Sequence, residues 1–361
     1  MNIRSEQPRI LIIGAGAVGG YIGAYLSRSG RDVILADPWV EHVEAMRRDG
    51  LRLQGTSPEE CFTTPVRALH LGELQSLRCE RLVDIVFISL KSYDTAWASM
   101  LLRDVLAPGA VVVVMQNSIN EPTVAEVLGW PCVLGGIANK IVVELIQPGF
   151  IRRAIAKGGA GFEVFRVGEP HGRITPRAKM IAEMLSEVDS TKITPALWGE
   201  RWSKLVQNAM SNAVASVSGL STRSYIEEPS TRRLSIRVAG ETAHVGQAIG
   251  YPLEPINGEA PELWIEAWRE AEGAASGNGA FKRAEEVVLG IASRMEYTAR
   301  PSMAQDLAKG RRSEIEHING MVVQEAASHG VEAPINAALL KRVREIELGR
   351  AAPSLDFARS I

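Results

Sequence analysis

The sequence predicts an α/β fold in which an N-terminal Rossmann-type, doubly wound sheet is followed by a C-terminal all-helical domain. In the first half, short apolar runs alternate with helical segments, and a glycine-rich turn follows the first run. Beyond residue 195, long segments with helical spacing replace the strand-like runs. Continuous rather than alternating hydrophobicity indicates strands buried on both faces, as in a parallel sheet covered by helices. We therefore expect one domain over residues 1–194 and a helical domain over residues 195–361.

The expected elements of the first half begin with a strand, a helix and a second strand. An apolar run at 9–13 ends at glycine, helical spacing follows over 18–29, and the second strand covers 32–37. Later strands are expected at 84–90, 111–115, 131–137 and 161–167. In the second half, apolar residues recur with a period of about 3.6, which predicts helices. These helices are expected at 198–218, 230–250, 262–272, 282–293, 313–328 and 336–347.

Composition and charge exclude several classes of protein. The chain has 361 residues, of which 46% are hydrophobic and 23% charged, so it is not expected to be disordered, collagenous or embedded in a membrane. Its 40 basic and 42 acidic side chains give a formal net charge of −2, and no overall charge recruits nucleic acid or an anionic membrane. The N-terminal segment is polar, and glycines interrupt the apolar run that follows it, which predicts neither a signal peptide nor a spanning helix.

The cysteines and histidines predict neither a disulfide framework nor a metal site. An odd number of widely spaced cysteines is typical of a reducing compartment, so we expect a cytoplasmic protein. The histidines are scattered and form no ligand pair at a usable spacing. The residues concerned are Cys61, Cys79 and Cys132, and His42, His70, His171, His244, His317 and His329.

A glycine-rich turn follows the first expected strand and opens the first expected helix. Its first glycine permits the tight turn, its second lets backbone amides approach a pyrophosphate, and its third allows the helix to pack closely on the strand. The helix N-terminus adds partial positive charge. This context predicts a dinucleotide-binding domain over residues 1–194. The turn consists of Gly14, Ala15, Gly16, Ala17, Val18 and Gly19.

Asp37, at the end of the second expected strand, bears on which dinucleotide is bound. A carboxylate there can accept hydrogen bonds from the adenosine ribose and would repel a 2′-phosphate. Pro38, Trp39 and Val40 follow it, so no basic residue comes directly afterwards. Alternatively, Asp37 is a solvated turn residue before proline and has no role in binding. The sequence favours NAD, with NADP as the other candidate.

Three polar residues form a stripe on the first helix of the second domain. Lys204, Asn208 and Asn212 stand at i, i+4 and i+8, a spacing that places side chains along one helical face. Apolar residues surround them, and a buried polar group without a partner costs about 1–3 kcal/mol. A substrate with carbonyl, hydroxyl and carboxylate oxygens would supply partners. The stripe could instead pack on backbone carbonyls or face water.

A second polar cluster lies nearer the C-terminus. It contains Ser302 and, twelve positions later, Glu314, which is expected to begin the helix at 313–328. An acidic residue at that place is stabilised by the positive end of the helix dipole, whether or not it has a further role. Trp264 and Trp268 stand between these clusters at i and i+4, a spacing that favours helix packing over a pocket wall or an oligomer contact.

Taken together, these motifs resemble the ketopantoate reductase (2-dehydropantoate 2-reductase) family over roughly residues 9–347. Each motif is common by itself, and their order and separation carry the resemblance. They are Gly14-Ala-Gly-Ala-Val-Gly19, Ser89-Leu-Lys91, Gln116-Asn117, Trp202-Ser-Lys-Leu-Val-Gln-Asn-Ala-Met-Ser-Asn212, Ser302-Met-Ala-Gln-Asp306 and Glu314-Ile-Glu-His-Ile-Asn-Gly320.

The resemblance implies a Rossmann domain and a helical domain with the substrate in the cleft between them, and an enzyme of pantothenate biosynthesis. It implies that Lys204 is the general acid and that Glu314 helps to hold substrate or cofactor. Asn208, Asn212 and Ser302 would contact the 2-keto acid. Lys91 and Asn117, at the ends of expected strands, would line the cofactor side.

The chemistry expected from these residue types is hydride transfer between a nicotinamide and C2 of a 2-keto or 2-hydroxy acid. Negative charge grows on the C2 oxygen, and a lysine ammonium about 3 Å away would stabilise it and supply the proton. A lysine can release a proton, whereas an arginine stays charged. The asparagine amides would add directional donors to the carbonyl or carboxylate.

Some positions depart from the family pattern and leave the substrate open. Ser118 stands where the family usually has glycine, Thr222 where some members place another asparagine, and Asp37 where NADP-dependent members use a basic residue. The interval of 98 positions between Lys204 and Ser302 is longer than expected. One alternative is therefore an NAD-dependent D-2-hydroxyacid dehydrogenase acting on a bulkier substrate.

Two further alternatives remain at this level. A 3-hydroxyacid or 6-phosphogluconate type dehydrogenase also carries a Lys-x-x-x-Asn helix, but Asn212 and the pair of Ser302 and Glu314 speak against it. The chain could also be a non-catalytic dinucleotide sensor, but such a protein would have no need for a lysine, two amides and a carboxylate facing one cleft. The expected partner is a small 2-keto or 2-hydroxy acid, and a homodimer is left open.

Overall fold

The computed structural model describes residues 7–139, 141–158, 163–273, 277, 279–293 and 295–361. The chain divides into two compact units, Met1–Leu197 and Trp198–Ile361. The expected boundary at 194/195 falls three positions before this division, where Thr194 and Pro195 precede the helix α7 (Leu197–Asn208).

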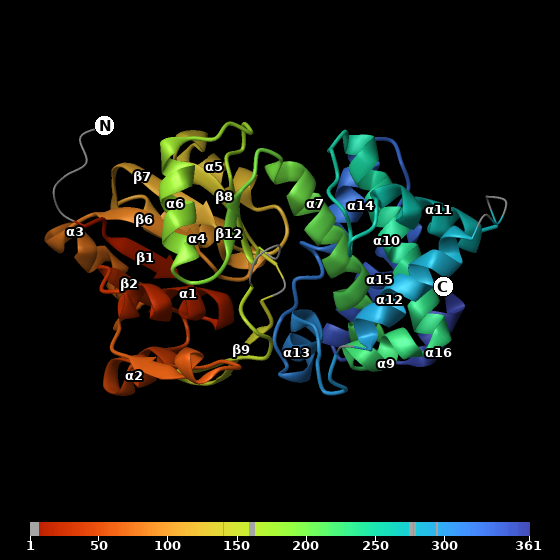
Figure 1. Ribbon diagram of the computed structural model, residues 1–361, viewed down its shortest axis with the longest axis horizontal. Helices are drawn as coiled ribbons and strands as arrows, with labels where there is room; N and C mark the ends of the chain where they lie inside the picture. The colour runs from red at the N-terminus through yellow and green to blue at the C-terminus, as the bar shows by residue number, and fades with distance from the viewer. Residues whose placement is uncertain (1–6, 140, 159–162, 274–276, 278, 294) are drawn as a thin grey trace. The chain divides into compact units, whose positions relative to one another are not determined.

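An eight-stranded sheet forms the centre of the first unit (Figure 1). The strand order is β12-β11-β8-β7-β6-β1-β2-β5, and all neighbouring pairs run parallel except β8 and β11. β1 lies between β2 and β6, so the strand order of the sheet reverses at β1. The strands are β1 (Ile10–Ile13), β2 (Val33–Asp37), β5 (Arg67–His70), β6 (Val83–Ile88), β7 (Leu106–Val114), β8 (Val133–Ala138), β11 (Phe165–Gly168) and β12 (Thr191–Ile193).

Helices cover both faces of this sheet, which explains the continuous apolar runs in the sequence. Ile10 and Ile12 pack on the side of α1 (Ala17–Arg28) and α6 (Pro176–Ser186). Leu11 and Ile13 pack on the opposite side, with α4 (Thr95–Leu102) and α5 (Glu121–Leu128). Full burial of one such aliphatic side chain stabilises a fold by about 1.5–3 kcal/mol. The alternation along β1 therefore ties both helical layers to one strand.

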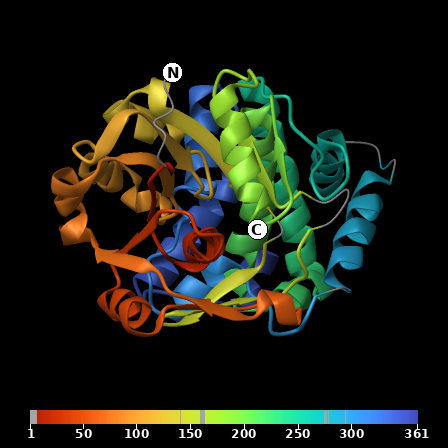
Figure 2. The ribbon, with the colours of Figure 1, turned by 60° about the vertical axis from the view of Figure 1, so that its left-hand side comes forward.

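The first unit also contains a four-stranded sheet that the sequence analysis did not predict. Its order is β4-β3-β10-β9, and Figure 2 shows its orange and yellow strands side by side below α1. A Cβ atom on Gly20 of α1 would lie 2.6 Å from Ile151 Cδ1, so the sheet packs against the glycine face of that helix. Its strands are short, and β3 has only alternate residues buried. They are β3 (Leu51–Gln54), β4 (Phe62–Thr64), β9 (Val143–Gln147) and β10 (Phe150–Arg153).

The predicted strands and the first helix are found close to their expected positions. The expected strand at 161–167 corresponds to β11, and residues 161 and 162 lie outside the described residues. The first unit also contains the α-helices α2 (Val40–Asp49) and α3 (Leu77–Glu80) and several short 3₁₀ turns.

The second unit is helical in its described part, where β structure is limited to one bridge between Ile256 and Glu259. α10 lies at its centre and packs against α9, α11, α12, α14, α15 and α16 (Figure 1). The helices after α7 are α8 (Val214–Ser218), α9 (Thr222–Glu227), α10 (Pro229–Ile249), α11 (Pro261–Ala271), α12 (Ala280–Ala292), α13 (Ser302–Ala308), α14 (Asn319–Ser328), α15 (Pro334–Glu347) and α16 (Leu355–Ser360).

Two expected helices differ from the structure. The helix expected at 198–218 is interrupted by a π-helical turn, Ala209–Ala213. The helix expected at 313–328 begins only at Asn319, so the prediction that Glu314 opens it is wrong. The Glu314 carbonyl accepts the N–H groups of His317 and Ile318, which closes a separate turn before α14.

Trp264 of α11 is a packing residue. It is completely buried, its Nε1 donates to the Ile256 carbonyl over 3.1 Å, and Gly240 of α10 leaves room for its backbone. Trp268 is half-buried and its ring lies 5.6 Å from that of His244. Among the described residues, the structure contains no helix with the length and apolar character needed to cross a membrane.

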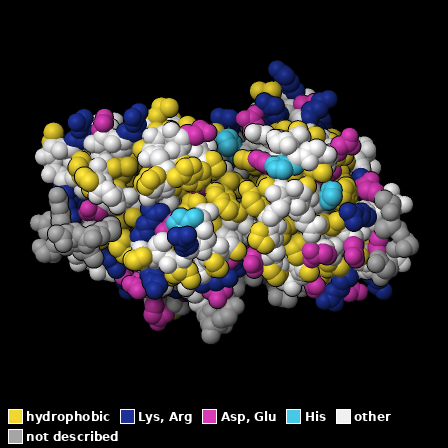
Figure 3. Space-filling view, turned by 90° about the horizontal axis from the view of Figure 1, so that it is seen from above, with side chains coloured by type: hydrophobic (Ala, Val, Ile, Leu, Met, Phe, Trp, Pro, Cys, Tyr) yellow, Lys and Arg dark blue, Asp and Glu magenta, His cyan; other side chains and the backbone are white. Residues whose placement is uncertain are grey.

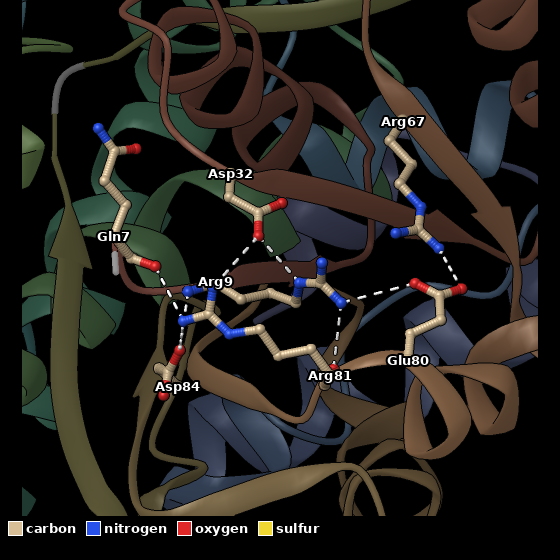
Figure 4. A network of polar contacts seen from close by, with 7 residues as sticks. All are labelled: Gln7, Arg9, Asp32, Arg67, Glu80, Arg81 and Asp84. Atoms are coloured by element: carbon tan, nitrogen blue, oxygen red, sulfur yellow. Dashed lines mark hydrogen bonds and ion pairs between the residues drawn. The ribbon is translucent and has the colours of Figure 1, made fainter. Parts of the chain in front are cut away.

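An ion-pair network joins the amino ends of β1, β2 and β6 (Figure 4). Arg9 donates from Nε to Asp32 over 2.9 Å and from Nη1 to the Arg81 carbonyl over 3.2 Å. The backbone N–H of Arg9 donates to Asp84, which also accepts from Arg81. The network therefore links the starts of three neighbouring strands, at the sheet edge opposite the glycine turn.

Replacing Arg9 with Met should lower the free energy of unfolding by about 1 kcal/mol, because the side chain is largely shielded and anchors two strands. The difference should shrink in 1 M salt, where the screening length falls to about 3 Å. Thermal unfolding at both ionic strengths measures it. Arg48→Met is the control, because Arg48 pairs with Asp49 in water with 72% of its side chain exposed. Equal effects of both substitutions would contradict a structural role for the network.

Candidate functional site

The glycine turn of the first unit has the shape of a phosphate cradle. Gly14 has φ +94°, and a Cβ atom there would lie 2.6 Å from the Leu90 nitrogen. A Cβ on Gly19 would lie 2.0 Å from the Gly14 carbonyl oxygen, so only glycine lets α1 come this close to β1. A Cβ on Gly16, by contrast, would meet no atom within 4 Å. The turn is tight underneath and open above, which fits the pyrophosphate of a dinucleotide.

The turn lies at the carboxyl end of β1, where the strand order reverses. In open α/β sheets, ligands bind at this switch point. Asp37 ends the neighbouring strand β2, is 7% exposed, and accepts the Trp39 N–H over 2.9 Å. The position and its residue type suit a ribose at the same sheet edge.

Lys91 and Asn117 follow β6 and β7, and buried side chains connect their loops. Both residues are half-buried. The Asn117 carbonyl accepts from Ser92 Oγ over 3.2 Å and from Asn120 Nδ2 over 2.7 Å. Gln116 Nε2 donates to the Lys91 carbonyl over 3.2 Å. The structure thus holds the two loops in fixed relation at the edge that carries the glycine turn.

Ser89 is a residue at this edge that the sequence analysis quoted but did not nominate. It follows β6, and its Cβ would lie 2.9 Å from a Cβ on Gly19. Its hydroxyl is buried and has no hydrogen-bond partner within the described part of the chain. The signal that could have found it is its position directly after the strand adjacent to β1.

Ser118 has a backbone conformation that favours glycine. Its φ is +66°, in the left-handed region, and it is 4% exposed. Glycine adopts this conformation freely, whereas a residue with a side chain is strained there. Ser118 therefore adopts this backbone conformation at a conformational cost.

The second unit holds Lys204 on α7, where neighbouring side chains fix the helix. Trp202 is completely buried and donates from Nε1 to the Thr242 carbonyl over 2.9 Å. Ser203 Oγ donates to the Glu254 carbonyl over 2.8 Å. Gly246 leaves room for the Trp202 ring. Lys204, the next residue, is half-buried.

The π turn directly follows Asn208 and contains Asn212. π turns inside helices are rare and are often found at functional sites. Asn208 Nδ2 is buried and no described protein atom accepts its hydrogen bond. Asn212 is 3% exposed.

Ser302 and Glu314 lie in the same unit as the polar helix. Ser302 is exposed at the first position of α13, and α13 packs against the π turn and α8. Glu314 is 4% exposed in the turn before α14. The structure therefore brings the helix of Ser302 to the asparagine-bearing turn. No group of three or more metal-ligating side chains occurs among the described residues.

A mostly parallel sheet with this switch point and cradle is typical of dinucleotide-binding proteins. Comparison with known families is more specific. The ketopantoate reductase PanE/ApbA family matches residues 10–161, and its C-terminal domain matches residues 196–347.

Relatives and solved structures agree with this match over nearly the full chain. The 2-dehydropantoate 2-reductase of Archaeoglobus fulgidus is 28% identical over 348 residues, which cover 94% of this chain and 98% of that protein. A ketopantoate reductase structure from Ralstonia eutropha is 25% identical with a TM-score of 0.70, covering 95% and 99% of the two chains. D-mandelate dehydrogenase with NADH and anilino(oxo)acetate is 20% identical with a TM-score of 0.77, covering 95% and 99%.

The chain belongs to the ketopantoate reductase PanE/ApbA family. The predicted family, the Rossmann-type α/β fold and the class of nicotinamide-dependent oxidoreductase are thereby confirmed. The roles of the individual site residues stay predictions.

Substitutions at Ser118 should reveal the strain in its loop. Ser118→Gly is expected to fold at least as stably as the parent, whereas Ser118→Val should be destabilised by about 2 kcal/mol, because a β-branched residue at positive φ is strongly disfavoured. Chemical unfolding measures both, and Ser118→Ala, which has a Cβ without branching, should fall between them. A valine variant as stable as the glycine variant would show that this loop carries no such constraint.

Proposed function

We propose that this protein transfers hydride between a nicotinamide dinucleotide and C2 of a 2-keto or 2-hydroxy acid, with 2-dehydropantoate as the first substrate to test. The observation that carries the proposal is the half-buried Lys204 on a helix in which Asn208, four positions later, buries an unsatisfied amide nitrogen. Such an amide is costly unless a ligand accepts its hydrogen bond. The names of the relatives supply the substrate class.

The proposed roles in the second unit follow from the chemistry of the side chains. The Lys204 ammonium donates to the C2 oxygen, stabilises the charge that grows there, and transfers the proton. Asn208 and Asn212 orient the acid through amide donors, and Ser302 adds a hydroxyl. Glu314, an acceptor when ionised, holds a substrate hydroxyl or the cofactor.

The cofactor is proposed to lie on the carboxyl edge of the first unit's sheet. When bound, the nicotinamide supplies hydride to C2 or accepts it in the reverse direction. The pyrophosphate would be held by the cradle Gly14, Ala15, Gly16, Ala17, Val18 and Gly19. Lys91 and Asn117 would line the nicotinamide side, and Asp37 would hold the adenosine ribose. Asp37 favours NAD, and NADP is the other candidate.

The partner and the compartment complete the proposal. On the face seen in Figure 3, basic and acidic side chains are interspersed rather than gathered by sign, which suits a small-molecule enzyme better than a nucleic-acid or membrane partner. All three cysteines are free, as is usual in the cytoplasm. A homodimer is the oligomer to test first, since a ketopantoate reductase from Staphylococcus aureus is described as dimeric.

A second candidate is an NAD-dependent D-2-hydroxyacid dehydrogenase for a bulkier acid. The long interval between Lys204 and Ser302, which contains α11 and α12, favours it. Initial rates with ketopantoate, phenylglyoxylate and branched 2-keto acids separate the two candidates. A pure dinucleotide sensor would bind NADH and oxidise it with none of these acids.

Lys204→Ala should reduce kcat by about 10²–10⁴-fold, the contribution typical of general acid catalysis, while the Kd for NADH stays within about threefold. Stopped-flow rates and NADH fluorescence measure the two quantities. Lys341→Ala is the control, because Lys341 is an exposed lysine on α15 of the same unit. Turnover within tenfold of the parent would end the assignment of Lys204.

Asp37→Ala should reduce the preference for NADH over NADPH by at least about tenfold, because the acceptor for the ribose and the repulsion of a 2′-phosphate are both removed. The ratio of kcat/KM for the two cofactors measures it. Asp49→Ala removes an exposed carboxylate at the far end of α2 and should leave the ratio unchanged. An unaltered ratio in the Asp37 variant would mean that another group selects the dinucleotide.

A further inference from the structure

A completely buried histidine lies directly beneath the phosphate cradle. His42 belongs to α2, outside every motif that carries the family resemblance, and none of its surface is exposed. Its Nε2 lies 2.9 Å from the Ala15 carbonyl oxygen in the middle of the glycine turn. Its Nδ1 accepts the Gly149 N–H over 2.9 Å. One imidazole therefore bridges the turn and the β9–β10 hairpin of the second sheet.

These two hydrogen bonds determine the tautomer of His42. Because Nδ1 accepts a hydrogen bond from a backbone N–H, it carries no proton in the neutral ring. The proton therefore lies on Nε2, where it donates to the Ala15 carbonyl. The ring acts as a directional donor toward the cradle.

This bond orients the peptide that links Ala15 to Gly16. In a trans peptide, the carbonyl and the following N–H point in opposite directions across one plane. With the Ala15 carbonyl held inward by His42, the Gly16 N–H is directed away from the protein interior. No acceptor meets this N–H among the described residues, and the Gly16 Cβ position is open over 4 Å.

The hairpin gives the histidine a fixed support. Gly149 has φ +73°, a Cβ there would lie 3.2 Å from Ala45 Cβ of α2, and its carbonyl accepts the Arg52 N–H over 2.9 Å. The Trp39 ring also packs on the imidazole, with 5.8 Å between ring centroids. Backbone and ring contacts thus hold the imidazole from several sides.

We propose that His42 is a positioning residue for the cofactor: its Nε2–H, braced by the hairpin, turns the Ala15–Gly16 peptide so that the Gly16 N–H meets the dinucleotide pyrophosphate. The inference rests on the proposed function, because it requires a dinucleotide on the cradle. It assigns a positioning role to α2, a helix outside the glycine motif, and the second sheet contributes only support for the His42 ring.

Two amide substitutions separate the two hydrogen bonds. The amide of His42→Gln extends far enough to donate to Ala15, as Nε2 does, whereas the shorter His42→Asn reaches only the place of Nδ1 beside Gly149. His42→Leu removes both. The Kd values of NADH and of ADP-ribose, which contains the pyrophosphate without the nicotinamide, are measured by calorimetry on the full-length protein.

The expected result is a dinucleotide Kd that depends on the Ala15 bond alone. His42→Asn and His42→Leu should bind both ligands at least about tenfold more weakly, and His42→Gln should stay within about threefold of the parent. The KM for the keto acid at saturating cofactor should change little in all three. Should the leucine variant fail to fold, the comparison of the two amides is sufficient.

Val43→Ala is the matched control for simple loss of packing. Val43 is the next residue of α2, is completely buried, and packs in the core of the first unit. The Val43→Ala substitution should lower the melting temperature without weakening the binding of the dinucleotide. The positioning role would be overturned if all His42 variants bound the dinucleotide with the same Kd. It would also be overturned if Val43→Ala weakened dinucleotide binding as much as His42→Leu does. Absence of NADH binding by the parent itself would instead refute the proposed function.

Discussion

The close approach of α1 to β1 and β6 is the constraint on which the first unit depends. It is possible only because Gly14 and Gly19 lack side chains at points where a Cβ would come within 2.6 Å of backbone atoms. The approach places the amino end of α1 over the carboxyl end of β1, where the strand order reverses. The ligand-binding edge, the loops of Lys91 and Asn117, and the open space above Gly16 all follow from this packing.

In the second unit, the notable feature is a set of polar side chains buried inside a helical domain. Trp202 and Ser203 anchor α7 on neighbouring backbone carbonyls, and the helix then changes to a π turn at Ala209–Ala213. An amide nitrogen of Asn208 is buried and unsatisfied directly before this turn, and Asn212 is buried within it. Burying this amide nitrogen without a partner costs free energy, which a ligand would offset by accepting its hydrogen bond. In the proposed function, these polar residues are the part of the helix that contacts the substrate.

Much of the fold of the first unit could be predicted from the sequence, because hydrophobic runs and glycine turns depend mainly on local interactions. The stretches 10–13 and 85–88 are apolar throughout, because both faces of their strands are covered by helices. The glycine turn has few alternatives to a tight backbone approach. The second sheet was missed, because β3 and β4 are short and only partly buried. In addition, the pairing of β3 with β10 joins segments about a hundred residues apart in the chain. The start of α14 was misplaced because the apolar spacing continues through a turn that closes on the Glu314 carbonyl.

The order of the elements and the position of the cradle could be inferred from the amino-acid sequence, since they depend on hydrophobic period and on local backbone sterics. Only the tertiary structure decided which of the candidate site residues are buried, which amide lacks a partner, and that the helix of Ser302 packs against the π turn. It alone also placed His42 between Ala15 and the hairpin. The reason is physical: burial and hydrogen bonding between distant segments depend on pairings that no local pattern records.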